Sequence, residues 1–275
     1  MTVDIGNTNI VVALFEGKKI KNEWRLHTDS DRTADEYGSM LRMFFSGANI
    51  SDEDITGGIL SSVVPLLIGP FINLMTKITG KKPILVGPSI YKKLPVKVPP
   101  SAINEIGTDL VANAVQAYTE YKKPCIVADF GTALTFTAID GTGQILGVAI
   151  TPGIRTAVHS LFANTAQLPS VPLEAPPDTL GTNTIYSIQA GIIMGYKGLV
   201  ESMILQMKAD MNNAKEKKCN VSKKDDNYSD EILVIATGGL NSVLRPLTNV
   251  FDKIDKELTL KGLNSIYRIM TESKA

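Results

Sequence analysis

The segments Asp4-Ile5-Gly6-Asn7 and Asp129-Phe130-Gly131-Thr132 decide the fold, because one short motif occurs twice, 125 positions apart. In both copies an apolar run that is typical of a buried strand leads into the motif. Two further strands follow, each after a tight turn. The six predicted strands span residues 2–5, 10–15, 19–25, 125–130, 134–139 and 144–150. The repeated order predicts two similar domains.

Helices and strands alternate in the rest of the chain, which indicates an α/β fold. Thr33-Ala34-Asp35-Glu36 is a capping box that opens a helix ending at Gly47. Thr108 begins another helix, and a long helical apolar stripe starts near Asn183. The polar segment 212–230 is expected to be a solvated loop. The remaining predicted elements are strands at 59–64, 83–86 and 231–236 and helices at 66–78 and 263–270.

Charge and composition point to a small-molecule partner. The chain of 275 residues has 28 basic and 28 acidic residues, so no global field draws it to nucleic acid or to an anionic membrane. Cys125, in an apolar run, is predicted to be a buried thiol, and Cys125 and Cys219 alone cannot build a disulfide framework or a zinc site. The first residues lack the pattern of a secretion signal, so a cytoplasmic location is expected.

The first motif continues as Asp4-Ile5-Gly6-Asn7-Thr8-Asn9, a tight turn with a carboxylate, a glycine and short polar side chains. Backbone N–H groups in such a turn can surround phosphate oxygens, and Asp4 can hold Mg²⁺ directly or through water. No Gly-Lys-Ser/Thr follows, so the turn is not a Walker loop. Taken alone, the pattern also fits simple turn chemistry.

The second motif favours the phosphate interpretation. Two similar units supply two carboxylates, Asp4 and Asp129, and two sets of turn donors, which suits a triphosphate and its cations. A third turn, Ala236-Thr237-Gly238-Gly239-Leu240, follows a strand, and its glycines let a base or ribose approach the backbone closely. Its alternative interpretation is an ordinary strand-to-helix turn. Together the three turns predict nucleotide binding.

Asp109, in Gly107-Thr108-Asp109, is the candidate catalytic base. It lies at the start of a predicted helix, where the helix field favours its ionised form. Asp4 and Asp129 are better placed for cations, which leaves Asp109 to accept the proton of a substrate hydroxyl. The alternative is that Asp109 only occupies the first turn of the helix.

These residues resemble the type III pantothenate kinase family, within the superfamily of actin, sugar kinases and acetate kinase. The resemblance covers nearly the whole chain and includes ordered motifs of several residues each. They lie at 4–9, 24–25, 32–37, 61–65, 107–109, 129–133, 150–153, 165–169, 181–184 and 236–239. It implies two ribonuclease H-like, actin-like ATPase domains at residues 1–117 and 118–275, with mixed sheets flanked by helices and an ATP cleft between them.

The resemblance also implies a reaction, which is ATP-dependent phosphorylation of pantothenate, the first step of coenzyme A synthesis. It implies a homodimer that uses Mg²⁺ and a monovalent cation, potassium or ammonium. Asp109 would be the proton acceptor, and Asp129 would bind the monovalent cation. The implied ATP-binding residues are Asp4, Ile5, Gly6, Asn7, Thr8, Asn9, Ile10, Val11, Thr132, Gly238 and Gly239. The implied substrate-binding residues are Gly107, Thr108, Asp109, Leu110 and Thr184.

One departure from the family concerns the acceptor site. The family usually has an arginine, a natural partner of a carboxylate, where this chain has Leu110, and Lys97 or Arg155 are candidates to replace it. The segment 98–104 also lacks the family's aromatic and proline pattern. A regulatory relative and a kinase for another small hydroxyl compound are therefore the alternatives. The apolar stripe between Ile185 and Met207 is the candidate dimer surface.

Overall fold

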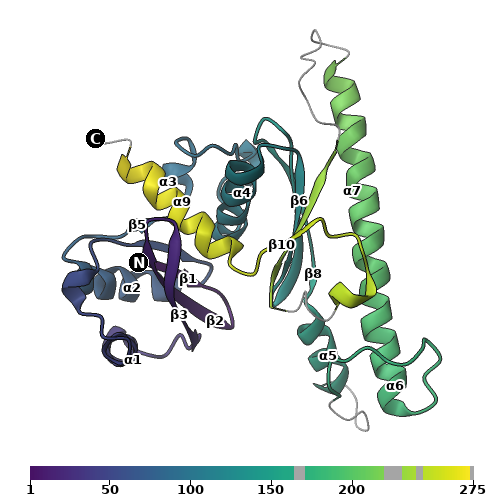
Figure 1. Cartoon of the computed structure of the whole chain (residues 1–275), viewed down its shortest axis with the longest axis horizontal. Coiled ribbons are helices and arrows are strands. Elements are labelled where there is room, and N and C mark those ends of the chain that lie inside the picture. The colour runs from purple at the N-terminus through teal and green to yellow at the C-terminus, as the bar shows by residue number, and fades with distance from the viewer. Residues whose placement is uncertain (164–170, 220–230, 240–243, 273–275) are drawn as a thin grey trace. The chain divides into compact units, whose positions relative to one another are not determined.

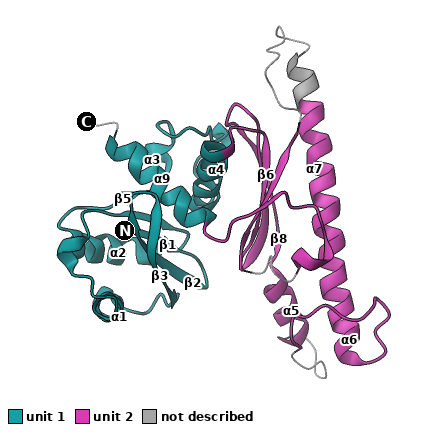
Figure 2. Cartoon of the chain, in the orientation of Figure 1, with its two compact units in different colours: residues 1–120, 258–275 teal, residues 121–257 magenta. Residues whose placement is uncertain are grey.

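The structure is a computed structural model that describes residues 1–163, 171–219, 231–239 and 244–272. It has two compact units, as Figures 1 and 2 show. Unit 1 comprises residues 1–120 and 258–275, and unit 2 comprises residues 121–257. Each unit contains a five-stranded mixed sheet with helices packed on it, which confirms the predicted α/β class.

The sheet of unit 1 has the strand order β3-β2-β1-β4-β5. The central strand β1 pairs antiparallel with β2 and parallel with β4. A polar turn separates β1 from β2, and Gly17, which has a positive φ of 60°, closes the hairpin between β2 and β3. The strands are β1 (Thr2–Ile5), β2 (Asn9–Glu16), β3 (Lys19–His27), β4 (Ile59–Ser62) and β5 (Ile84–Leu85).

The helices that begin at Ala34 and Thr108 start where the sequence signals predict, whereas the C-terminal helix begins at Leu258, before the predicted start at 263. The Thr33 hydroxyl accepts from the backbone N–H of Glu36, and the Glu36 carboxylate accepts from the backbone N–H of Thr33, so the capping box is formed. The α-helices are α1 (Ala34–Gly47), α2 (Pro65–Thr79), α3 (Pro88–Tyr91), α4 (Thr108–Tyr121) and α9 (Leu258–Glu272). Short 3₁₀ turns lie at η1 (Asp52–Asp54) and η2 (Pro100–Ala102).

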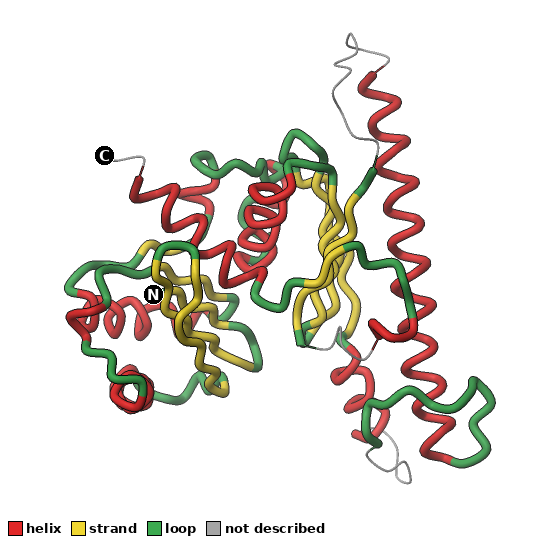
Figure 3. Tube along the Cα trace, viewed as in Figure 1, coloured by secondary structure: helices red, strands yellow, loops and turns green. Residues whose placement is uncertain are grey.

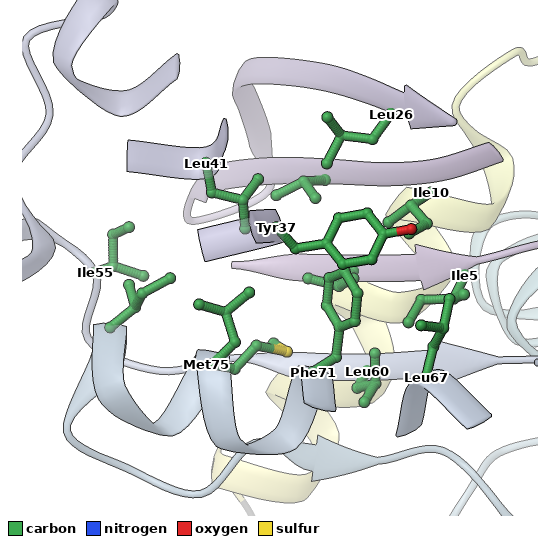
Figure 4. Packing of buried hydrophobic residues seen from close by; sticks show 14 of the residues in the cluster. Ile5, Ile10, Leu26, Tyr37, Leu41, Ile55, Leu60, Leu67, Phe71 and Met75 are labelled. Carbon is green, nitrogen blue, oxygen red and sulfur yellow. The ribbon is translucent and has the colours of Figure 1, made fainter. Parts of the chain in front are cut away.

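One face of this sheet forms the core of unit 1 with α1 and α2 (Figure 4). Tyr37 and Phe71, whose ring centroids are 5.0 Å apart, pack beside Ile5 and Leu60 from the central strands. Trp24 stacks on Phe44 at the border of this core. Because side chains alternate along a strand, Asp4 points to the other face.

Helix α9 packs with unit 1, although the sequence-based division grouped it with the second half of the chain. It contacts β1 and β4, and Gly262 lies against the backbone of Ala112 in α4. A Cβ atom at Gly262 would overlap the Ala112 carbonyl group, so the two helices approach closely only because this residue is glycine. Such a contact joins segments far apart in the chain, and no local pattern predicts it.

The sheet of unit 2 repeats the topology of unit 1. Its order, β8-β7-β6-β9-β10, has the central strand β6 antiparallel to β7 and parallel to β9. The predicted bounds of the first strand in each unit agree with the structure. The strands are β6 (Cys125–Phe130), β7 (Ala133–Ile139), β8 (Ile145–Pro152), β9 (Leu233–Gly238) and β10 (Lys253–Ile254). Cys125 is buried, as predicted, and burial raises its pKa to about 12.

Long helical segments cover one face of this second sheet (Figure 3). Most of the predicted apolar stripe packs against the sheet of its own unit, with Tyr196 8% exposed and Val200 fully buried beside it. The helical elements are α5 (Ile154–Ala163), α6 (Thr184–Gln189), the π-helical η3 (Ala190–Met194), α7 (Gly195–Cys219) and the 3₁₀ turn η4 (Arg245–Leu247). No sequence pattern predicted the π-helical turn.

The predicted loop at 212–230 is wrong over its first part, because α7 continues to Cys219. Residues 214–218 read Ala-Lys-Glu-Lys-Lys, and these are strong helix formers that extend an existing helix in water. Residues 220–230 lie outside the described part of the chain.

Candidate active site

The first Asp-x-Gly turn joins β1 to β2 in unit 1. The backbone N–H of Gly6 donates to the carbonyl of Asn9 at 3.0 Å, which closes the turn. The hydroxyl of Thr28, the residue after β3, donates to the Gly6 carbonyl at 2.7 Å. Asn7 and Thr8 are exposed at the tip. The predicted polar turn is therefore formed, and its tip is open to a ligand.

Asp4 belongs to a chain of hydrogen bonds on the face of the sheet opposite the apolar core. Asp4 and Ser61 lie opposite each other in the parallel pairing of β1 with β4. The Ser61 hydroxyl donates to Asp4 Oδ1 at 2.8 Å and lies 2.9 Å from the hydroxyl of Thr108, the first residue of α4. The structure thus brings Asp4 and Thr108 together, and Ser61, which had no predicted role, joins them.

Asp109 follows Thr108 in the first turn of α4. Burial raises the pKa of its carboxyl, and hydrogen bonds from the backbone N–H groups of Leu110 and of Asp109 itself act in the opposite direction. Gly107 leaves room for this carboxylate, because a Cβ atom there would overlap Asp109 Oδ1. A carboxylate with a raised pKa is a stronger base than an ordinary aspartate, as proton abstraction requires.

Tyr91 lies outside every sequence motif of the predicted site. It ends α3 and is 4% exposed. Burial, together with the charge of Asp109, raises the pKa of its phenol to about 12. The Tyr91 phenol near the Asp109 carboxylate is therefore neutral across the physiological pH range.

The second Asp-x-Gly turn joins β6 to β7 in unit 2. The backbone N–H of Gly131 donates to the Ala133 carbonyl at 3.0 Å. The Thr132 carbonyl accepts from the backbone N–H of Gly153 at 2.9 Å and from the hydroxyl of Thr156 at 2.6 Å. Gly131 and Thr132 are exposed, so this turn also presents its tip to solvent.

Glycines let neighbouring backbone approach this second turn. A Cβ atom at Gly153 would overlap the carbonyl oxygen of Gly131, and one at Gly238 would lie 2.6 Å from the Phe130 carbonyl oxygen. Gly238 also has φ +84°, which disfavours other residues. Thr237 and Gly238, predicted to begin a turn, are instead the last two residues of β9 and lie beside the end of β6.

Asp129 lies between two threonines in the sheet of unit 2. It is opposite Thr135 on β7 and opposite Thr237 on β9, and directly opposed side chains share a face. Thr135 Oγ1 is buried and has no hydrogen-bond partner among the described residues. A buried hydroxyl without a protein partner is an expected ligand of water or an ion.

The predicted substrate residues are divided between the units. Gly107, Thr108, Asp109 and Leu110 are in unit 1, whereas Thr184 begins α6 in unit 2 and is exposed. Leu110 is only 7% exposed, so it is a core residue. The two proposed replacements for the missing arginine, Lys97 and Arg155, are exposed. Leu240 and the motif at 165–169 lie outside the described residues.

The carboxylates of the site do not form a ready-made metal centre. Within the described ranges, no group of three or more His, Cys, Asp or Glu side chains could hold a metal ion. Mg²⁺ in phosphoryl-transfer sites usually takes one or two carboxylates, water and the substrate phosphates, so a single carboxylate such as Asp4 fits it. In the described part of the chain, no helix combines the length and apolar character needed to cross a membrane.

The fold places the chain among known architectures. A solved structure of a Baf family transcriptional activator from Campylobacter jejuni matches with a TM-score of 0.59 at 16% identity, covering 99% of this chain and 98% of that one. The ethanolamine utilization protein EutJ from Carboxydothermus hydrogenoformans matches with a TM-score of 0.51 at 13% identity, covering 96% and 88%. The duplicated sheets with their Asp-x-Gly turns define an actin-like ATPase fold.

Sequence comparisons identify the family within that class. The family model for type III pantothenate kinase matches residues 1–206. The type III pantothenate kinase of Moorella thermoacetica is 39% identical over 267 residues, which cover 97% of this chain and 98% of that protein. The chain belongs to the type III pantothenate kinase family.

Proposed function

We propose that the chain phosphorylates pantothenate with ATP, the first step of coenzyme A biosynthesis. The family membership supports the reaction. The observation in the fold that carries it is the pair of Asp4 and Asp109, held on neighbouring elements of unit 1 through Ser61 and Thr108. The Asp4 carboxylate is suited to hold a cation, and the Asp109 carboxylate is suited to accept a proton.

Asp109 is the proposed proton acceptor. As the acceptor hydroxyl oxygen bonds to the γ-phosphorus, the bond from that phosphorus to the β–γ bridging oxygen breaks, ADP leaves, and the hydroxyl proton passes to the Asp109 carboxylate. The raised pKa of Asp109 suits this role, because a more basic carboxylate takes the proton more readily. Below that pKa the carboxyl is protonated, so turnover falls as the solution becomes more acidic.

The nucleotide contacts are proposed in each unit separately. In unit 1 they are the residues from Asp4 to Val11, whose exposed tip offers backbone N–H groups, with Asp4 holding the Mg²⁺ that neutralises phosphate charge. In unit 2 they are Thr132, Gly238 and Gly239. Gly239 supports this assignment, because no described atom lies within 4 Å of its Cβ position and a flat ligand could approach the backbone there.

A monovalent cation, potassium or ammonium, is proposed beside Asp129. The buried Thr135 hydroxyl, opposite Asp129 on β7, fits such an ion because it lacks a partner among the described residues. The cation would lower the electrostatic cost of placing phosphate groups near the Asp129 carboxylate. Activity and ATP binding should therefore both increase when sodium is replaced by potassium.

A panel of acceptor compounds tests whether pantothenate is the substrate. The purified chain is incubated with ATP, Mg²⁺ and potassium, and with pantothenate, pantetheine or a simple sugar, and products are measured by mass spectrometry. Phosphopantothenate formation is expected. Phosphorylation of another compound alone would make the chain a kinase for that compound, and Leu110 is where such a change would arise. ATP binding without any product would contradict the kinase proposal and favour a regulatory relative.

The homodimer and the cytoplasmic location remain predictions from the sequence and its resemblance. Most of the stripe between Ile185 and Met207 packs on its own unit, so it offers less free apolar surface than the sequence pattern indicates. The exposed apolar side chains on the same helical segment are Ile185, Tyr186 and Leu205. Sedimentation at working concentration should report a dimer, and Leu205→Glu is the variant that tests this surface.

A further inference from the structure

Ser61 holds an unusual position for a polar side chain. It is 0% exposed and lies on β4 directly after Leu60, which belongs to the apolar core. A buried hydroxyl costs stability unless its hydrogen bonds are made, so a strand that only packed would favour an apolar residue here. Ser61 uses its hydroxyl for Asp4 on one side and Thr108 on the other.

The direction of these hydrogen bonds follows from the number of protons. A serine hydroxyl has one hydrogen, and Ser61 donates it to Asp4 Oδ1 at 2.8 Å. Within the contact of 2.9 Å between the two hydroxyls, Thr108 is then the donor to Ser61, and the more distant Ser62 carbonyl, at 3.4 Å, is the alternative acceptor of the same proton. The chain runs from Thr108 through Ser61 to Asp4 and ends on the carboxylate.

This chain fixes two elements that carry the proposed chemistry. Asp4 lies on β1, and Thr108 is the first residue of α4, immediately before Asp109. The three residues are far apart in the sequence, because Ser61 is 57 residues from Asp4 and 47 from Thr108, so only the fold brings them together. Ser61 therefore sets the orientation of the Asp4 carboxylate and the position of the first turn of α4 at the same time.

We propose that Ser61 is a positioning residue for phosphoryl transfer, acting through Asp4 and through Thr108. The proposal rests on the proposed function, because Asp4 and Asp109 take their roles from it. Ser61 contacts Asp4 and Thr108, and it would act on the reaction through these two residues. Ser61 would affect the rate of phosphoryl transfer, because a small displacement of aligned reacting groups lowers that rate strongly.

The test compares Ser61→Ala, Ser61→Thr, Thr108→Val and the double variant Ser61→Ala/Thr108→Val. Thr76→Val is the matched control, because Thr76 donates to the Ile72 carbonyl at 2.6 Å within α2, outside this chain of hydrogen bonds. The measurements are kcat, KM for pantothenate, the Mg²⁺ concentration for half-maximal rate, and thermal stability.

Ser61→Ala should lower kcat about tenfold to a hundredfold and raise the half-maximal Mg²⁺ concentration, with little change in KM. Ser61→Thr keeps the hydroxyl and should recover most of kcat even if its extra methyl group lowers stability. Thr108→Val should add little to Ser61→Ala, because both remove the same connection. Thr76→Val should leave kcat unchanged.

The inference is overturned if Ser61→Ala lowers stability but keeps the wild-type kcat and Mg²⁺ requirement, or if the two single substitutions act independently. A wild-type chain without kinase activity would contradict the proposed function instead. In that case, Mg²⁺-dependent ATP binding, measured by calorimetry, tests whether Ser61 positions Asp4. Weaker binding in Ser61→Ala than in Thr76→Val would support its link to Asp4, and equal binding would refute it.

Discussion

The two Asp-x-Gly turns have the same strand topology but are held in different ways. In each, a glycine N–H closes the turn at 3.0 Å, on the Asn9 carbonyl in unit 1 and on the Ala133 carbonyl in unit 2. The turn of unit 2 is one residue shorter, because four residues separate the paired Ile5 and Ile10 whereas three separate Phe130 and Leu134.

Side chains organise the surroundings of the first turn, and backbone contacts organise those of the second. Asp4 is joined to α4 by hydroxyl groups. The second turn lies against Gly153, and β6 ends against Gly238, with no space for a side chain at either position. We infer that unit 1 supplies the reacting groups, which must be oriented, and that unit 2 supplies a rigid backbone surface for phosphate.

The largest effect is expected in unit 1. Asp109→Asn removes the proposed base without changing the size of the side chain, and turnover should fall about 10²–10⁴-fold. Steady-state formation of phosphopantothenate measures it. Turnover equal to the wild type would exclude Asp109 as the proton acceptor.

In unit 2, the largest expected effect of a substitution is on the free energy of unfolding. Gly153→Ala places a methyl group on the Gly131 and Thr132 carbonyl oxygens and should lower the free energy of unfolding by about 1–3 kcal/mol. Gly147→Ala on β8 is the control, because no atom lies within 4 Å of its Cβ position. Urea denaturation measures both, and equal effects would show that the close contact at Gly153 has no energetic role.

The pH dependence of stability should separate Asp109 from the other carboxylates. Its folded pKa is raised above 3.8, so the folded chain holds this proton to higher pH than the unfolded chain, and stability falls as the pH rises through that window. Asp109→Asn lacks this loss and should be more stable than the wild type at neutral pH. The difference should shrink as the pH falls towards 3.8. A pH-independent difference between the two proteins would contradict the assignment.

The smallest effects are expected at the threonines that support each turn. Thr28 donates to the Gly6 carbonyl and Thr156 to the Thr132 carbonyl. Thr28→Val should lower the free energy of unfolding by about 1 kcal/mol, and Thr156→Val by less, because Thr156 is exposed and water can replace its hydroxyl. Chemical denaturation of the two variants side by side measures the difference, and the reverse order would contradict this view of the second turn.

Local patterns in the sequence predicted the parts of the fold that local physics determines. The strands that contain Asp4 and Asp129 agree in their bounds, because an apolar run ends where a polar glycine turn must begin. The capping box at Thr33 and the helix start at Thr108 also agree. The same patterns identified Asp4, Asp109 and Asp129 as site candidates.

Contacts between distant segments were not predictable in this way. Ser61 meets Asp4 because β1 pairs with β4, and it meets Thr108 because α4 begins beside β4; no nearby residue signals either meeting. The burial of Tyr91 beside Asp109 and the return of α9 to unit 1 depend on tertiary packing too. The missed residues therefore position the predicted ones.

The division of roles between the turns is tested most directly by nucleotide binding alone. Isothermal titration calorimetry with a nonhydrolysable ATP analogue, Mg²⁺ and potassium compares the wild type with Asp109→Asn and Asp129→Asn. The dissociation constant should be unchanged in Asp109→Asn and should rise about tenfold or more in Asp129→Asn, which loses a charged ligand of the proposed cation. An equal change in the two variants would contradict the assignment of proton transfer to Asp109 in unit 1 and of the cation that assists nucleotide binding to Asp129 in unit 2.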